Sequence, residues 1–266
     1  MLDKIDLNEV VVIAKKAGDA IMQIYEKDFR VAYKDDKSPL TEADIKSNEI
    51  ICTALQEAYP DIPLLSEENK EVPYKVRKTW EYYWCIDPID GTKEFIKKNG
   101  EFTVNIALIH KDTPVLGVVY APALGDMYKA KKGSGAFKNE QKLPLKVNKT
   151  PEKTLRVVAS KSHLSEETQT FIDALEAESI EQVSKGSSLK LCMVAEGVAD
   201  IYPRLAPTME WDTAAADAIV RESGKMTYQY YPSLQTQNRE ALRYNKKDLL
   251  NPMFLVKSHQ LTVGNL

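Results

Sequence analysis

The feature that most constrains the fold is a run of aromatic and apolar residues that ends in two carboxylates. Residues 79–87 read TWEYYWCID, a composition typical of a strand entering the core. The chain continues as PIDGT (88–92), so Asp87 and Asp90 are three residues apart. Proline fixes one backbone angle and glycine permits a sharp turn, which lets both carboxylates converge on one point.

Two like charges this close would repel, and each would take up a proton or need a cation between them. Oxygen ligands favour Mg²⁺, Mn²⁺ or Ca²⁺ over zinc, and the chain has only three histidines. The alternative interpretation is a solvated Asp-Pro turn followed by a helix cap. D-x-x-D-G alone, expected by chance on the order of 0.07 times in this length, still favours the turn. The longer motif D-P-x-D-G-T is a few hundredfold rarer, and together with the aromatic strand before it and the further acids it favours a metal site.

Three further acids could belong to the same site. Glu67 follows the apolar pair Leu64-Leu65, although a Ser-Glu-Glu loop is more commonly solvated surface. Asp212 lies at the start of a predicted helix, where capping is the default role. Asp44 lies three residues after Thr41, so a capping pair is an equally good interpretation. The alanines after Asp212 leave room for close approach by another element.

Composition and charge limit the classes of protein to which this chain can belong. The 266 residues carry a net charge of −3 and are 43% hydrophobic, as expected for one large domain or two intimate lobes. The near-neutral charge argues against binding of a nucleic acid polymer by bulk phosphate attraction. No stretch reaches the ~20 apolar residues of a membrane span, and the N-terminus lacks a secretory pattern, so we expect a cytoplasmic protein. The three cysteines suggest neither disulfides nor a zinc site.

The pattern of elements changes near residue 150. Before it, helices are predicted over 7–27 and 39–60, and strands over 102–110, 115–122 and 126–130 that form an antiparallel meander. After it, strands alternate with helices, which indicates an α/β lobe. The predicted strands there are 155–160, 180–187 and 200–205, and the predicted helices are 165–178, 189–199 and 211–224. We expect lobes of about 1–150 and 151–266 in a single compact domain.

The order of these motifs resembles the inositol monophosphatase superfamily of metal-dependent, lithium-sensitive phosphatases. The motifs are Thr41-Glu42-Ala43-Asp44, Ser66-Glu67-Glu68, Asp87-Pro88-Ile89-Asp90-Gly91-Thr92 and Trp211-Asp212-Thr213-Ala214-Ala215. The resemblance implies an α+β or α/β layered sandwich (αβαβα) with a mixed N-terminal sheet and a smaller α/β C-terminal lobe. It implies two or three Mg²⁺ ions, replaceable by Mn²⁺ and inhibited by Ca²⁺ and Li⁺.

The resemblance also implies a role for each acid. Glu67, Asp87 and the carbonyl of Ile89 would hold one ion, and Asp87, Asp90 and Asp212 a second, with Glu67 reaching a third. Thr92 and Asp44 would orient and deprotonate the attacking water. Two ions about 3.5–4 Å apart can stabilise the attacking and leaving oxygens of an in-line phosphoryl displacement. The helix expected to start near Gly91-Thr92 would direct free N–H groups at the phosphate.

The substrate is expected to lie against the second lobe. The tract from Gly186 to Val220, with NKKDLLNPMFL (245–255), is similar to the CysQ-type 3′(2′),5′-bisphosphate nucleotidases. This implies hydrolysis of adenosine 3′,5′-bisphosphate to AMP and phosphate, linked to sulfate assimilation and turnover of PAPS. The residues implied to bind the nucleotide are Gly91, Thr92, Ser160, His163, Gly186, Ser187, Lys190 and Arg204. One departure is Ala216, where many relatives have glycine, and we expect only minor tightening there.

Two other functions stay open from the sequence. One is an inositol monophosphatase or another sugar-phosphate phosphatase, because the acidic motifs are common to several phosphatases. The other is a metal or nucleotide sensor without activity, although a water-activating Thr92–Asp44 pair would be superfluous there. The sequence leaves open whether the protein is a monomer or a homodimer and whether it lies peripherally at the inner membrane.

Overall fold

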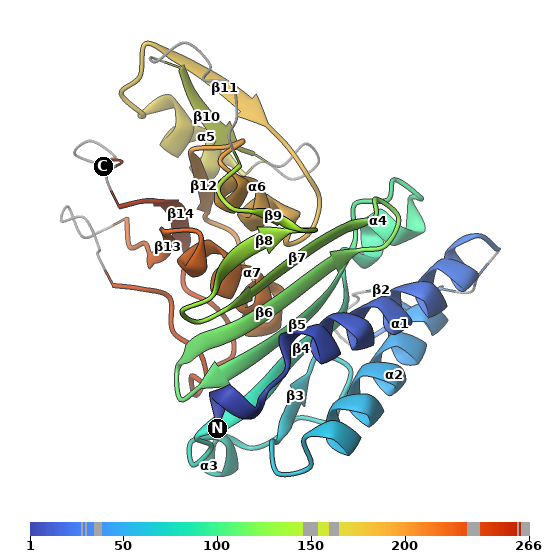
Figure 1. Cartoon of the computed structure of the whole chain (residues 1–266). Coiled ribbons are helices and arrows are strands. Elements are labelled where there is room, and N and C mark those ends of the chain that lie inside the picture. The colour runs from blue at the N-terminus through green and yellow to red at the C-terminus, as the bar shows by residue number, and fades with distance from the viewer. Residues whose placement is uncertain are drawn as a thin grey trace.

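The computed structural model describes residues 1–27, 29, 31–34, 39–145, 154–159, 165–232, 240–259 and 261. Its helices are η1 (Leu2–Lys4), α1 (Leu7–Tyr25), α2 (Glu42–Ala58), α3 (Tyr74–Arg77), α4 (Thr92–Ile96), α5 (Glu166–Asp173), α6 (Leu189–Glu196) and α7 (Glu210–Glu222). Helices and two large sheets alternate in five layers (Figure 1). The predicted αβαβα sandwich is therefore confirmed.

The first large sheet has seven strands in the order β3-β4-β5-β6-β7-β8-β9. They are β3 (Leu64–Ser66), β4 (Tyr82–Asp90), β5 (Thr103–His110), β6 (Thr113–Ala121), β7 (Asp126–Lys131), β8 (Gly135–Lys138) and β9 (Gln141–Lys142). β3 pairs parallel with β4, and the other pairs are antiparallel, so the predicted meander is confirmed. β4 continues past Asp87 to Asp90, with a register shift against β5 between those two residues.

Helices α1 and α2 cover the outer face of this sheet (Figure 1). Val10, Ala14, Ala17 and Ile21 of α1 are fully buried, which is the helical spacing expected from the sequence. α2 begins after Thr41, whose hydroxyl accepts the N–H of Ala43, as a residue that caps a helix does. A small hairpin, β1 (Val31–Tyr33) and β2 (Pro39–Thr41), precedes α2.

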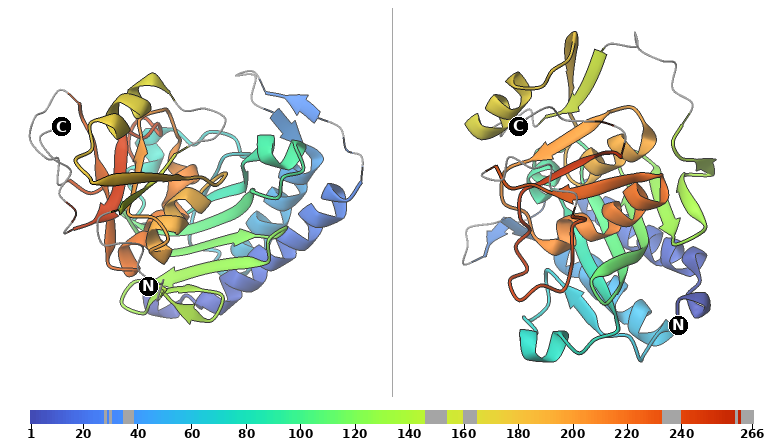
Figure 2. Two further views of the ribbon diagram at one scale, coloured as in Figure 1. Left: turned by 90° about the horizontal axis from the view of Figure 1, so that it is seen from above. Right: turned by 90° about the vertical axis from the view of Figure 1, so that its left-hand side faces the viewer.

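Helices α6 and α7 form the middle layer, between the two sheets (Figure 2). The second sheet contains β10 (Thr154–Val158), β11 (Ser179–Val183), β12 (Ile201–Arg204), β13 (Lys225–Gln229) and β14 (Phe254–Ser258), in the order β11-β10-β12-β14-β13. β10, β11 and β12 are parallel, as alternating strands and helices predict, whereas the last two strands are antiparallel. α5 packs on the outside.

Helix α7 approaches the first sheet very closely at Gly117 of β6. A Cβ atom on Gly117 would lie 2.1 Å from the carbonyl oxygen of Ala215 and 2.8 Å from the Cβ of Ala218. The small residues on both sides therefore permit the contact that the alanines after Asp212 predicted. α7 also packs against β13 of the second sheet, so it lies in the hydrophobic core between the two sheets.

In the part of the chain that the structure describes, none of the helices combines the length and apolar character required to cross a bilayer.

Candidate functional site: an acidic metal centre

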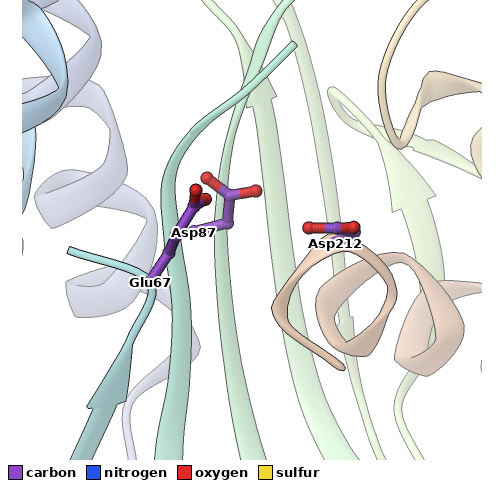
Figure 3. Close-up of side chains that lie close together, drawn as sticks. All are labelled: Glu67, Asp87 and Asp212. Atoms are coloured by element: carbon purple, nitrogen blue, oxygen red, sulfur yellow. The ribbon is translucent and has the colours of Figure 1, made fainter. Parts of the chain in front are cut away.

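Three carboxylates from distant parts of the chain meet between the two sheets. Glu67 follows β3, Asp87 lies in β4, and Asp212 lies in the first turn of α7 (Figure 3). Each offers an oxygen, and these oxygens lie within 4.8 Å of one another. Asp87 is almost fully buried, while Glu67 and Asp212 are half-buried. The hard oxygen donors fit a divalent cation.

Asp90 and Ile89 line the same cavity, which has a volume of about 450 Å³. The Ile89 N–H donates to Asp87 Oδ1 at 3.1 Å, so the turn after β4 fixes one oxygen of that carboxylate. Asp90 Oδ2 accepts the N–H of Ser188 at 2.5 Å, across the gap between the lobes. The structure therefore brings together all five predicted metal-binding residues, with Asp90 tied to the second lobe.

The predicted water-activating pair is also in contact. Thr92 Oγ1 lies 3.3 Å from Asp44 Oδ1 and 3.3 Å from the carbonyl oxygen of Ile89. The other oxygen of Asp44 accepts the N–H of Thr41 at 2.7 Å and its hydroxyl at 2.6 Å. Asp44 thus makes the contacts of both interpretations, because one oxygen caps α2 and the other contacts Thr92. Burial raises the pKa of Asp44, although its hydrogen bonds from Thr41 lower it.

Lys34 is a cation at this site that the sequence did not reveal. Its ammonium lies 2.8 Å from Glu67 Oε1 and 2.6 Å from Glu68 Oε1. Burial lowers the pKa of Lys34, but the two carboxylates outweigh this effect and raise it above its ordinary value. No motif surrounds Lys34, and its partners are more than 30 residues away, so only the fold makes the contact visible.

The acidic cluster holds protons more tightly than free carboxylates do. Withdrawal from solvent, then the charge of Asp90, raises the pKa of Asp212 to about 8. Withdrawal from solvent also raises the pKa of Asp90 to about 6, against the lowering effects of Lys190 and the Ser188 N–H. The pKa of Asp87 is raised by burial and by the surrounding carboxylates. Such a cluster is stabilised by a cation.

Metal affinity should therefore increase with pH. Below about pH 8 Asp212 is mostly protonated in the metal-free protein, and a cation must displace that proton. We expect Mn²⁺ affinity to rise between pH 6 and 8, by up to about tenfold per pH unit for each proton displaced. Calorimetric titrations in buffers of different ionisation enthalpy measure both the affinity and the protons released. Equal affinity at pH 6 and pH 8 would contradict this prediction.

A basic cavity adjoins the acidic one. It has a volume of about 80 Å³ and is lined by Ser187, Lys190 and Arg204 together with Asp90 and Asp212, so the two cavities share walls. The Arg204 guanidinium is held by hydrogen bonds to the carbonyl oxygens of Ala206 and Pro207. Three predicted substrate residues thus lie beside the predicted metal ligands.

The remaining predicted substrate residues have different outcomes. Gly91 lines the acidic cavity with φ +90°, a conformation that favours glycine, and α4 starts directly after it. Gly186 lines neither cavity, because its N–H donates to Glu101 Oε2 at 2.8 Å and its α-carbon packs against the Glu101 backbone. Gly186 therefore shapes the loop. Its predicted role as a substrate ligand stays a prediction. Ser160 and His163 lie outside the described residues.

Sequence reasoning also missed Thr103 and Asn105 in β5. Both are buried, and both contact the Ser187-Ser188 loop. A usable signal was present, because two polar residues at alternate positions of an otherwise apolar strand share one face and need polar partners there.

Comparison with known proteins agrees with this geometry. The model of the inositol monophosphatase family matches residues 5–261. The chain therefore belongs to the inositol monophosphatase family, whose members depend on metal ions.

The similarity of the chain to individual proteins points to one branch of the inositol monophosphatase family. It is 45% identical over 253 residues to the 3′(2′),5′-bisphosphate nucleotidase CysQ of Salmonella typhimurium, covering 94% of this chain and 98% of the relative. Against the protein of that name from Escherichia coli K12 the identity is 43% over 252 residues, with the same coverage. The crystal structure of CysQ from Bacteroides thetaiotaomicron matches with a TM-score of 0.83 and 43% identity, over 96% of this chain and 97% of that one.

Proposed function

We propose that this protein is a Mg²⁺-dependent 3′(2′),5′-bisphosphate nucleotidase that hydrolyses adenosine 3′,5′-bisphosphate to AMP and phosphate. The observation that carries the proposal is that Asp90 and Asp212 line one cavity with other acids and a second with Lys190 and Arg204. One phosphate of the substrate would lie at the acidic metal centre and the other beside the two cations. The reaction links the protein to sulfate assimilation and PAPS turnover, and the 43–45% identity to CysQ nucleotidases supports it.

The metal would be held by Glu67, Asp87, Asp90, Asp212 and the carbonyl of Ile89. When bound, Mg²⁺ supplies Lewis acidity that lowers the pKa of a coordinated water and neutralises charge on the phosphoryl oxygens.

The chain itself supplies the proton acceptor and the phosphate contacts. Thr92 contacts Asp44, so a water that donates to the Thr92 hydroxyl oxygen can pass its proton through that hydroxyl to the carboxylate. The raised pKa of Asp44 makes it a better base than an exposed carboxylate. The left-handed Gly91 starts α4 at the cavity wall, where the first N–H groups of a helix are free to bind phosphate oxygens.

A phosphate-release assay tests the proposal directly. In Mg²⁺, adenosine 3′,5′-bisphosphate should give a kcat/KM at least about tenfold higher than inositol 1-phosphate, since one charge-assisted phosphate contact is worth that much. PAPS belongs in the same panel as the sulfated analogue. Equal or reversed preference would favour the inositol monophosphatase alternative. Nucleotide binding without phosphate release would favour the sensor.

Lys190 should determine the preference for a second phosphate. Lys190→Ala removes a cation from the wall of the basic cavity, so we expect KM for the bisphosphate to rise about 10- to 100-fold with little change in kcat. Hydrolysis of inositol 1-phosphate should change less than threefold. Lys185→Ala is the matched control, because Lys185 lines neither cavity and pairs with Glu101 at 3.5 Å. Equal KM changes for both substrates would contradict this assignment.

A further inference from the structure

A buried group of polar side chains connects the two lobes behind the metal centre. Thr103 and Asn105 belong to β5, and Ser187 and Ser188 precede α6. The hydroxyls of Thr103 and Ser188 donate to Asn105 Oδ1 at 3.1 and 3.0 Å. Thr103 Oγ1 also lies 2.9 Å from the hydroxyl oxygens of Ser187 and Ser188. We call these four residues the lobe-joining network.

The network ends at a predicted metal ligand. The Ser188 backbone N–H donates to Asp90 Oδ2 at 2.5 Å, while the Ser188 hydroxyl donates to Asn105. Ser188 is therefore held from two directions, and its amide has little freedom to move away from Asp90. Because Thr103, Asn105 and Ser188 are nearly inaccessible to water, losing one partner would leave the others without a replacement.

The network uses only the carbonyl oxygen of Asn105, and the amide nitrogen of this side chain is a separate feature. Its Nδ2 is buried and has no hydrogen-bond partner among the described residues. Asn105 is also paired in register with Asp87 across β4 and β5. Directly opposed residues of an antiparallel pair place their side chains on the same face, with Cβ atoms about 4.5–5.5 Å apart. A buried amide donor thus adjoins the most buried carboxylate of the metal centre.

We propose that Asn105 is a positioning residue of the metal centre. Through its carbonyl oxygen it fixes Ser188, whose N–H holds Asp90. Its amide N–H₂, which has no partner among the described residues, is available to the Asp87 carboxylate on the same face of the sheet. One side chain thereby sets two metal-binding carboxylates relative to each other. This inference rests on the proposed metal-dependent function, and it gives a role to a buried polar amide in a largely apolar strand.

The test measures Mn²⁺ affinity separately from turnover. In Asn105→Leu, a size-matched change, Mn²⁺ affinity measured from the electron paramagnetic resonance signal of the free ion should fall about tenfold or more. Thermal melting shows whether the variant is folded. Ser188→Ala keeps the backbone N–H but loses the hydroxyl, so it provides a second variant with a smaller loss. The double variant should lose less than the two single effects combined, because both changes break one link.

Thr227→Val is the matched control, since Thr227 also has a buried hydroxyl without a partner in the described part of the chain, but lies in β13 and lines neither cavity. Its Mn²⁺ affinity should stay within twofold of the parent. The inference is overturned if folded Asn105→Leu and Ser188→Ala bind Mn²⁺ as tightly as the parent. A failure of the proposed function gives a different result. In that case the parent protein itself would release no phosphate from the bisphosphate.

Discussion

We expect Asp90→Asn to lower kcat by roughly three orders of magnitude while leaving the protein folded. Asp90 lines both cavities and receives the Ser188 N–H, so it lies where the metal centre meets the substrate lobe. Asparagine keeps the size of the side chain and its carbonyl acceptor, but it removes the negative charge that a divalent ion requires. Replacing the buried carboxylate with a neutral amide also removes repulsion from neighbouring acids, so stability should not fall.

Phosphate release under saturating Mg²⁺ and bisphosphate measures kcat, and thermal melting measures stability. Asp61→Asn, in the exposed loop between α2 and β3, is the control for loss of one acidic charge and should have parental kcat. A near-normal rate for Asp90→Asn would reject this carboxylate as a metal ligand.

Gly117→Ala destabilises the protein by about 3 kcal/mol, the upper end of the cost of overpacking a core. The new methyl group would lie 2.1 Å from the carbonyl oxygen of Ala215, so α7 must move away from β6. Because Asp212 lies in the first turn of α7, that movement also displaces a metal ligand. We therefore expect weaker Mn²⁺ binding together with the lower free energy of unfolding, both measured on the purified variant.

Gly125→Ala is the control for Gly117→Ala, because it adds the same methyl group where only backbone strain, and no steric clash, is expected. Gly125 has φ +70° and no atoms near the position of an added Cβ, so alanine there costs only about 1–2 kcal/mol. Its Mn²⁺ affinity should match the parent. If Gly117→Ala proves as mild as Gly125→Ala and binds Mn²⁺ normally, the close contact between α7 and β6 does not position the site.

The acidic residues of the site could be predicted because they lie in short sequence motifs. Asp87, Asp90 and Thr92 lie within six residues of one another at the end of one strand, and the turn itself brings them together. Asp212 and Asp44 each begin a helix, so their positions follow from helix boundaries. In both cases the prediction depended on local geometry, which sequence patterns record well.

The contacts between distant segments could not be predicted in the same way. Lys34 meets Glu67 only because the first hairpin lies beside the end of β3. Gly186 was expected to contact the substrate, and nothing in the sequence indicated that it packs against Glu101 and donates its N–H to that side chain. The two C-terminal strands β13 and β14 were also not assigned, since antiparallel pairing after an alternating pattern has no strong local signal. These features depend on which elements become neighbours.

The position of α7 limits how the protein can admit its ligand. This helix is embedded in both halves of the molecule, with Gly117 against its back and Asp212 at its tip. A hinge motion that opened the space between the two sheets would separate α7 from one of the sheets on which it packs. We therefore expect ligand exchange to proceed without a hinge motion that separates the two sheets.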